Sequence, residues 1–358
     1  MDVSYTRCCG LDIHKRTVVA CLIVPGTDGQ PDKQIRTFGT MTADLLALAD
    51  WLAAAQCTHV AMESTGVFWQ PIYNVLEDRF TLLLVNARHI KTVPGRKTDI
   101  RDCEWIADLL RHGLLRPSFV PDRPQRELRE LTRYRTALAD ERAAEVNRLQ
   151  KTLEGANIKL AAVATDSLGV SGRQMLEALV AGTTDAPTLA ALAKGRLRAK
   201  LPQLEQALAG RVGPHQRFLL ARQLAHIDFL DAQIVEVSAE IAERLRPFEA
   251  EVARLDTIPG VGQRTAEILL AELGADLQRF PSAKHLASWA GMCPGNRESA
   301  GKRYSGKTRK GNPYVRRALV EAAQAAGHTR IPTWQRSIGA SHPAVARRRL
   351  RSQSAIAS

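Results

Sequence analysis

The strongest candidates for chemistry are four acidic residues in the first third of the chain, Asp12, Glu63, Asp99 and Asp102. The first two each end a short apolar, strand-like run, and the last two open a helical pattern. Residues three apart share one helix face, so Asp99 and Asp102 can point the same way. Oxygen-rich clusters hold Mg²⁺ or Mn²⁺, and two such ions can activate a nucleophile and stabilise a leaving oxygen in phosphodiester chemistry. The pattern therefore predicts a catalytic Mg²⁺ or Mn²⁺ site built from four carboxylates.

Each acid also has a structural explanation. An Asp after a strand is often a turn residue, and acids in a first helical turn complement the helix dipole. The ordered combination of strand-Asp-hairpin, strand-Glu-turn and a helix with Asp-x-x-Asp favours the metal site over separate structural roles. His14, two residues after Asp12, has two interpretations: it orients a ligand or touches DNA, or it is a surface residue at a hairpin.

Elements that could position these acids follow from hydrophobic periodicity. Residues 1–116 read as α/β, with expected strands at 8–11, 18–24, 35–40, 58–63 and 80–85. Helices are expected at 42–55, 67–78 and 99–112. Three β-rich segments followed by alternating helix and strand are the order of an RNase H-like (RuvC-type) domain.

A predominantly helical region is expected at 117–250. Pro117, Pro121 and Pro124 indicate a linker, and a long amphipathic helix follows at 125–153. After a Gly/Ser/Thr-rich interlude, a second long helix is expected at 216–247. The two helices suit an antiparallel coiled-coil arm or dimerisation with a partner chain, which we favour, while an ordinary helical bundle within one domain is the alternative.

The segment 251–330 reads as a mainly helical C-terminal domain. Pro259, Gly260 and Gly262 lie in a Pro-Gly-Val-Gly turn before a helix start, as in a helix-hairpin-helix element. Such glycines let backbone amides approach a phosphate beside a helix N-terminus, although a simple Gly-rich turn is the alternative. The stretch 289–313 is rich in Gly, Lys and Arg, and a helix is expected at 314–326. Candidate phosphate contacts there are Lys302, Arg303, Lys307, Arg309, Lys310, Arg316 and Arg317.

Composition narrows the class of protein. A length of 358 residues exceeds one typical core, and the 45% hydrophobic content suffices for globular packing. The formal net charge of +13 favours a nucleic-acid partner over a small-metabolite enzyme, with a merely basic solvated surface as the alternative. The six cysteines lack zinc-site spacing. No signal peptide or membrane-spanning run is found in the sequence, so a reducing, cytoplasmic location is expected, with no membrane partner.

Six short motifs together give the chain a specific resemblance. They are Gly-Leu-Asp-Ile-His-Lys at 10–15, Met-Glu-Ser-Thr-Gly at 62–66, Lys-Thr-Asp-Ile-Arg-Asp at 97–102, Ile-Pro-Gly-Val-Gly at 258–262, Glu-Ser-Ala-Gly at 298–301 and Lys-Gly-Asn-Pro at 310–313. With them the chain resembles the IS110 family of insertion-sequence transposases, whose relatives include the Piv DNA invertase. The resemblance covers roughly residues 7 to 330, around a more variable helical middle.

That resemblance implies a DEDD catalytic domain of RuvC type, with Asp12, Glu63, Asp99 and Asp102 as metal ligands, joined to a domain that contributes a serine nucleophile. The serine is Ser299, and Ser305 is the competing candidate by local chemistry. Ser299 is expected to attack DNA and form a phosphoserine link that strand exchange reseals. Further implied partners are a noncoding guide RNA and further copies of the chain in a homodimer or homotetramer.

One departure concerns the end of the chain. Family members usually finish with a further apolar helix, whereas residues 331–358 form a basic segment without helix-core periodicity, expected to be disordered. Two other functions stay open. A resolvase-like nuclease would use the same carboxylates with water as the nucleophile, and a non-catalytic nucleic-acid-binding protein would use the acids only for structure.

Overall fold

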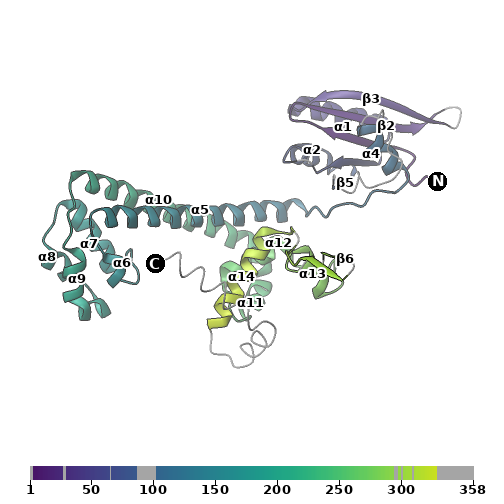
Figure 1. Ribbon diagram of the computed structural model, residues 1–358. Helices are drawn as coiled ribbons and strands as arrows, with labels where there is room; N and C mark the ends of the chain where they lie inside the picture. Colours follow the sequence, from purple (N-terminus) through teal and green to yellow (C-terminus); the bar gives the residue numbers. More distant parts are fainter. Residues whose placement is uncertain are drawn as a thin grey trace. The chain divides into compact units, whose positions relative to one another are not determined.

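The computed structural model describes residues 3–26, 30–64, 66–86, 102–293, 297–299, 301–308 and 310–328, and it divides into two compact units at Pro121 and Asp122 (Figure 1). Two of the candidate site residues, Asp99 and Arg309, lie outside the described residues, as does the basic segment 331–358.

The first unit contains a five-stranded sheet. Its strands, in spatial order, are β3 (Pro31–Gly39), β2 (Thr17–Pro25), β1 (Cys8–Ile13), β4 (His59–Glu63) and β5 (Thr81–Val85). The first three strands of the chain pair antiparallel, and β4 and β5 extend the sheet in parallel to β1. This mixed α/β arrangement is compatible with the expected RNase H-like domain. All five strands overlap the segments that periodicity predicted, although β3 begins four residues before the expected 35–40.

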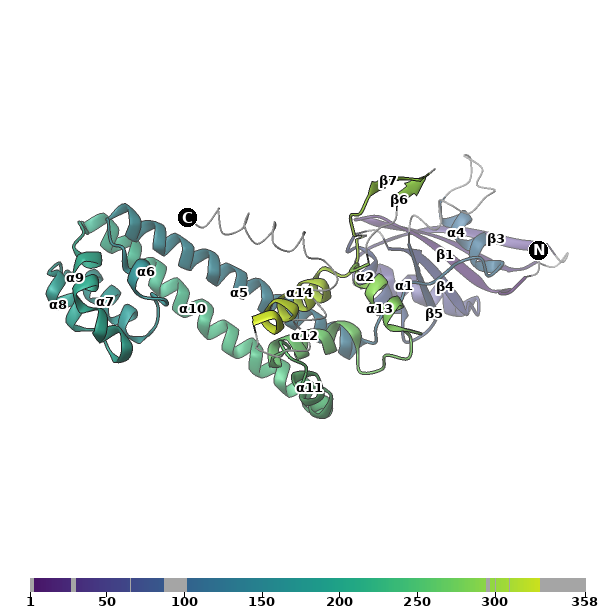
Figure 2. The same cartoon turned by 60° about the horizontal axis from the view of Figure 1, so that its bottom comes forward.

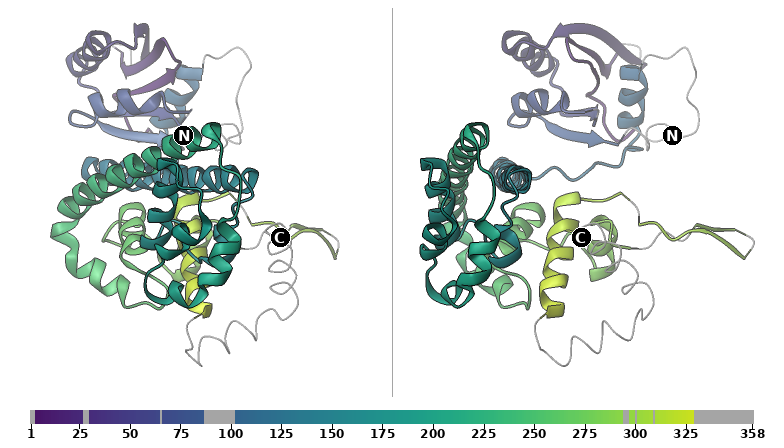
Figure 3. Two further views of the ribbon diagram at one scale, coloured as in Figure 1. Left: turned by 90° about the vertical axis from the view of Figure 1, so that its left-hand side faces the viewer. Right: turned by 60° about the vertical axis from the view of Figure 1, so that its left-hand side comes forward.

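Helices flank both faces of this sheet, as Figure 3 shows. The helices α1 (Thr42–Ala54) and α2 (Trp69–Leu76) cover one face, where their leucines pack with Leu11, Leu22 and Met62. The helix α4 (Asp102–Arg111) covers the other face and packs with Cys8, Cys21 and Ala61. Alternate residues of β1 therefore serve two separate cores, because successive side chains of a strand point to opposite faces.

Two long helices, α5 (Arg123–Gly155) and α10 (Pro214–Leu245), form the backbone of the second unit and lie side by side (Figure 2). They run antiparallel: Leu128 packs with Ile241, and further along α5 Leu138 packs with Leu230. The carboxylate of Asp122 caps α5 by accepting the backbone N–H of Gln125 at 3.2 Å. Pro124, expected in the linker, lies in the first turn of α5, where a missing N–H costs nothing.

Between these helices the interlude expected to be merely Gly/Ser/Thr-rich forms a helical cap. It consists of α6 (Leu160–Val163), α7 (Val170–Ala181), α8 (Ala186–Ala191), η1 (Gly195–Lys200) and α9 (Leu201–Leu208). Leucines and Met175 from these helices are buried against the ends of α5 and α10. Because this segment is divided among five short helices, no single period of 3.6 residues extends through it, and they were not identified from the sequence.

The remainder of the second unit is a small helical cluster with a β-hairpin. Its elements are η2 (Arg246–Phe248), α11 (Glu249–Asp256), α12 (Gln263–Leu273), α13 (Ala283–Trp289), β6 (Arg297–Ser299), β7 (Lys302–Ser305) and α14 (Pro313–His328). Ala266 and Leu269 of α12 pack with Val315 and Ala318 of α14. In the part of the chain that is described, no helix has the length and apolar character needed to cross a membrane.

Candidate active site

Asp12 and Glu63 lie on neighbouring parallel strands of the first unit. The register pairs Leu11 with Met62, so the next residue of each strand lies at the same level of the sheet. Leu11 and Met62 both face α1 and α2. Asp12 and Glu63 therefore share the opposite face, on which α4 packs. Adjacent parallel strands thus deliver two carboxylates to one place at their carboxyl ends.

Gly10 brings α4 close to the same place. A Cβ added to Gly10 would lie 2.4 Å from both the backbone nitrogen of Ala107 and the carbonyl oxygen of Cys103. The helix therefore rests directly on the strand two residues before Asp12, on the face that Asp12 shares. Asp102 is the first residue of α4, so this contact positions the third carboxylate.

The three carboxylates are close enough to affect the ionisation of Asp12. Partial burial is the largest cause that raises the pKa of Asp12 above its ordinary value, and the charges of Asp102 and Glu63 raise it further. His14 opposes this shift, with its Nε2 atom 3.2 Å from Oδ2 of Asp12. A group of like charges on a partly buried surface is held at a cost in stability, which is common where a site serves a ligand.

Carboxylate oxygens are the donors that Mg²⁺ and Mn²⁺ prefer, so the chemistry of this donor set fits the expected ions. Within the residues that the structure describes, no group of three His, Cys, Asp or Glu side chains is close enough together to hold a metal ion. Asp99, the fourth expected ligand, lies outside those residues. The structure thus brings Asp12, Glu63 and Asp102 to one region of the sheet, and the metal site stays a prediction.

Ser299 is the last residue of β6 and pairs with Lys302 across a short antiparallel hairpin. Only the backbone is described at Ser299, Arg303 and Ser305. The chain segments before and after the hairpin meet: a Cβ on Gly311 would lie 2.3 Å from the backbone nitrogen of Gly291. The hairpin therefore extends from a closed base, and Gly311 supplies the close approach.

A fully buried carboxylate connects the base of the hairpin to α5 and α12. Glu272 of α12 has 0% exposure and accepts two hydrogen bonds from Arg133 of α5, at 2.7 and 2.9 Å. It also accepts a hydrogen bond from Nδ2 of Asn312 at 2.7 Å. The other amide atom of Asn312 accepts the backbone N–H groups of Tyr314 and Val315 and so caps α14. Asn312 belongs to the Lys-Gly-Asn-Pro motif, so that motif anchors α14 to α5 and α12.

The expected helix-hairpin-helix turn joins α11 to α12, and its two glycines differ. Gly260 has a φ of +84°, and a Cβ there would lie 2.1 Å from the carbonyl oxygen of Ala322. Gly260 therefore makes room for α14, and its contact with a phosphate stays a prediction. Gly262 has nothing within 4 Å of an added Cβ, and it begins α12 without a side-chain cap. Pro259, which follows α11 and precedes both glycines, is partly buried.

The basic candidates also fall into distinct groups. Lys302, Lys307, Lys310 and Arg316 are exposed. Arg317 instead binds Asp140 of α5 in a fork, at 2.6 and 2.7 Å, and donates to Glu321 at 2.8 Å. The sequence did not single out the arginines of α5, of which Arg135 forms a buried pair with Glu267 at 2.6 Å. The partners are 132 residues apart (267 minus 135), so no local pattern could have revealed them.

Comparison with known proteins matches the two ends of the chain to transposase families. Residues 9–158 match a family model described as "Transposase", and residues 252–338 match one described as "Transposase IS116/IS110/IS902 family". The acids of the first unit lie in the first match, and Ser299 lies in the second.

Individual proteins similar to this chain are named after insertion elements or after the inversion of a pilin gene. The chain is 28% identical over 251 residues to the "Insertion element IS110 uncharacterized 43.6 kDa protein" of Streptomyces coelicolor, covering 64% of this chain and 61% of that protein. It is 30% identical over 274 residues to the "Insertion element IS900 uncharacterized 42 kDa protein" of Mycobacterium paratuberculosis, covering 66% of each. It is 31% identical over 117 residues to the "Pilin gene-inverting protein" of Moraxella bovis, covering 32% of this chain and 34% of that one. The chain thus spans between a third and two thirds of the length of these relatives.

Proposed function

Because the chain belongs to the IS110 family of insertion-sequence transposases, we propose that it cuts and rejoins DNA strands during movement of such an element. The observation that carries this proposal is the gathering of Asp12, Glu63 and Asp102 on one face of the sheet, where their charges interact. A merely structural set of acids would gain nothing from that mutual repulsion.

The carboxylates are proposed to hold divalent cations, with Asp12, Glu63, Asp99 and Asp102 as the ligands for Mg²⁺ or Mn²⁺. When bound, such ions supply an activated nucleophile and stabilise charge on the leaving oxygen. The protein's own contribution is positional: β1 and β4 hold two acids in register, and the contact at Gly10 holds the start of α4 over them.

Ser299 is proposed as the nucleophile. Its Oγ forms a bond to a DNA phosphorus, the bond from that phosphorus to a deoxyribose oxygen breaks, and the serine proton is lost while the leaving oxygen gains one. A serine hydroxyl is a weak nucleophile, and no histidine lies in the segment 297–305 to act as its base. The phosphoserine conserves the phosphodiester bond energy, so resealing by the reverse attack needs no ATP.

DNA and a noncoding guide RNA are the proposed nucleic acids, and a homodimer or homotetramer is the proposed assembly. The antiparallel pair of α5 and α10 suits a coiled-coil arm, and the α11–α12 turn suits a helix-hairpin-helix element. The proposed domain boundaries are 1–116, 117–250 and 251–330, followed by the basic segment 331–358.

The test is incubation of the protein with Mg²⁺, DNA carrying the element ends, and the transcript that flanks the gene, followed by a denaturing gel. Wild type and Ser305→Ala are expected to form a covalent protein–DNA adduct, and Ser299→Ala is expected to form none. If Ser299→Ala still releases free cut ends, the nucleophile is water and the resolvase-like function is correct instead.

A further inference from the structure

The two-stranded hairpin of β6 and β7 places a lysine directly opposite Ser299 in its register. Ser299 is paired with Lys302, and only two residues separate them along the chain. One of the two, Gly301, has a φ of +72°, a left-handed conformation that tight hairpin turns require. The next pair is Glu298 with Arg303, and the register shift of the hairpin lies on the N-terminal side of Glu298. The turn therefore fixes Lys302 opposite Ser299 with no bulge between them.

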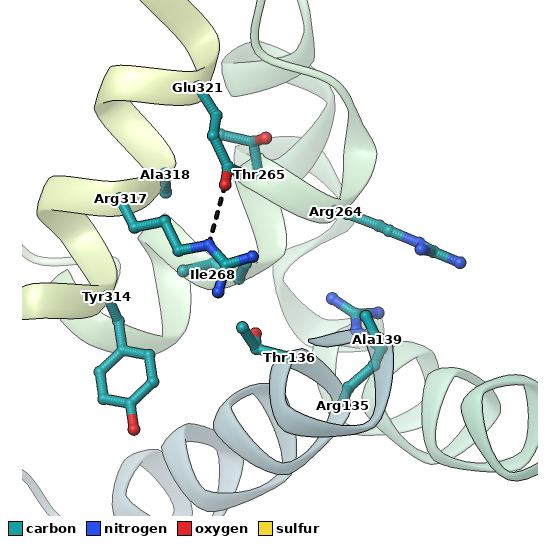
Figure 4. A pocket seen from close by; sticks show the side chains of 10 residues that line it. All are labelled: Arg135, Thr136, Ala139, Arg264, Thr265, Ile268, Tyr314, Arg317, Ala318 and Glu321. Atoms are coloured by element: carbon teal, nitrogen blue, oxygen red, sulfur yellow. Dashed lines mark hydrogen bonds and ion pairs between the residues drawn. The ribbon is translucent and has the colours of Figure 1, made fainter. Parts of the chain in front are cut away.

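Lys302 differs from two other basic candidates of this region in what lies near its charge. Arg303 has an acid, Glu298, opposite it in the register, and opposite charges in such positions attract. Arg317 donates to Glu321 at 2.8 Å, the interaction drawn in Figure 4. Lys302 is exposed, and within the described part of the chain it forms no ion pair. The charge of Lys302 is therefore available to an anion.

A lysine opposite a serine in a hairpin can contact whatever the serine attacks. Residues directly opposite each other in an antiparallel pair share one face, with their Cβ atoms roughly 4.5–5.5 Å apart. The flexible side chain of lysine ends in an ammonium group with three donors. Cations so placed stabilise the charge on phosphate oxygens during phosphoryl transfer. The hairpin extends away from α12 and α14, as Figure 3 shows, which leaves Lys302 accessible to a DNA strand.

We propose that Lys302 is a catalytic residue that holds the DNA phosphate attacked by Ser299. The assignment rests on the proposed serine mechanism. The Lys302 ammonium donates to a nonbridging oxygen of that phosphate while the bond from Oγ to phosphorus forms and the bond from phosphorus to the deoxyribose oxygen breaks. Lys302 keeps its proton throughout: the serine proton passes to water, and the leaving oxygen takes a proton from water. A negative charge at position 299 is stabilised by this cation even without DNA.

The first test measures that effect without DNA or metal. Ser299→Cys replaces the hydroxyl by a thiol, whose reaction with iodoacetamide requires the ionised form. All forms also carry Cys293→Ser, which removes a partly exposed thiol. The other five native cysteines are buried, and burial raises the pKa of Cys8, Cys21 and Cys57 to about 12. The pH profile of alkylation at low ionic strength then reports the thiol at position 299.

Adding Lys302→Gln to this background should move the midpoint of the pH profile upward. Two opposite charges about 4 Å apart in water attract by roughly 1 kcal/mol, which corresponds to about fivefold more thiolate at a pH below the midpoint. Lys302→Arg keeps the charge and should keep the lower midpoint. Lys284→Gln removes an equal charge from an exposed position of α13 and should change nothing. Equal midpoints with and without Lys302 would overturn the proposal.

The second test measures the rate of adduct formation and the affinity for DNA separately, with Ser299 in place. Lys302→Gln should slow adduct formation at saturating DNA roughly 10²-fold, the cost of removing one donor that stabilises the transition state. The slope of log K against log salt for DNA binding should fall by only about 0.9, the contribution of one phosphate contact. Lys302→Arg should recover most of the rate, and Lys284→Gln should match wild type. An unchanged Tm in Lys302→Gln excludes a folding defect as the cause.

The outcomes distinguish this inference from the proposed function. If wild type forms no adduct, the proposed function fails and the role of Lys302 falls with it. If wild type forms the adduct and Lys302→Gln forms it equally fast, the serine mechanism stands and only the role of Lys302 is wrong.

Discussion

The carboxyl group of Asp12 lies in a place that is unfavourable for its charged form. Its strand places the carboxyl where burial and two other carboxylates raise its pKa, and only His14 opposes them. A protein selected for stability alone would replace such a residue by a neutral one of similar shape. Its presence is explained if a cation is the intended neighbour, because the same oxygens that repel one another then share a positive charge.

Asp12→Asn is therefore expected to raise Tm near pH 7 and to reduce DNA cutting roughly 10²–10³-fold, the usual cost of one group that stabilises the transition state. Because the folded-state pKa is raised, the penalty removed by the variant is absent below the ordinary carboxyl pKa of 3.8. It grows as pH rises toward the folded-state pKa and is constant above it. Unfolding curves between pH 3 and 8 measure this dependence.

Asp50→Asn is the control, because Asp50 is an exposed carboxylate paired with Arg79. It should give no rise in Tm at any pH and should leave cutting unchanged. An Asp12→Asn variant with full cutting activity would favour the alternative in which the acids serve only structure.

At the scale of elements, two close contacts decide where functional groups lie. Gly10 lets α4 rest on β1, and Gly311 lets the base of the Ser299 hairpin close against Gly291. In both places backbone meets backbone, so the missing side chain cannot be replaced by a flexible one. The position of a helix or hairpin then depends on a residue that takes no part in chemistry.

Gly10→Ala should destabilise the protein by about 1–3 kcal/mol, the range for overpacking, because α4 must move away from the sheet. The same movement displaces Asp102, so DNA cutting should fall as well. Urea unfolding and the cutting assay measure the two effects. Gly155→Ala is the matched control: an added Cβ there meets nothing within 4 Å, and the residue lies in α5, so stability should be unchanged or higher.

Glu272 carries the connection between α5, α12 and α14. Glu272→Gln should cost about 3–5 kcal/mol, because it leaves the charge of Arg133 without its buried counter-charge and disturbs the bond to Asn312. Urea unfolding measures this cost. Glu240→Gln, which removes an exposed partner of Arg244, should cost about 1 kcal/mol or less. Equal costs for both variants would contradict the role assigned to Glu272.

At the scale of the whole molecule, the net charge is expected to govern the proposed affinity for nucleic acid. An excess of 13 positive charges is spread along the sequence rather than confined to one segment. Contacts to phosphates carry no sequence information, so most of the affinity should be independent of sequence.

DNA affinity is therefore expected to fall steeply with salt. If 6–10 phosphates are contacted, it should drop by about 10³–10⁵ between 50 and 200 mM salt, and equally for unrelated duplexes. Anisotropy titrations with two duplexes of different sequence measure both points. A weak salt dependence would contradict a binding mode dominated by the backbone.

The amino-acid sequence alone determined which segments are strands and long helices, since periodicity is a local property: β1 to β5, α5, α10 and α14 lie where it predicted them. It also located Asp12 and Glu63 at strand ends, because an apolar run stops where the chain leaves the core. The short cap helices α6 to α9 were missed because no single period of 3.6 residues extends through the segment that they divide.

Only the tertiary structure decided which distant groups meet. It assigned Gly260 to the packing of α14, engaged Arg317 with Asp140, and buried Glu272 between Arg133 and Asn312. These contacts join residues 40 to 177 positions apart. Their formation depends on how whole helices pack against one another, and local sequence patterns carry no information on that packing.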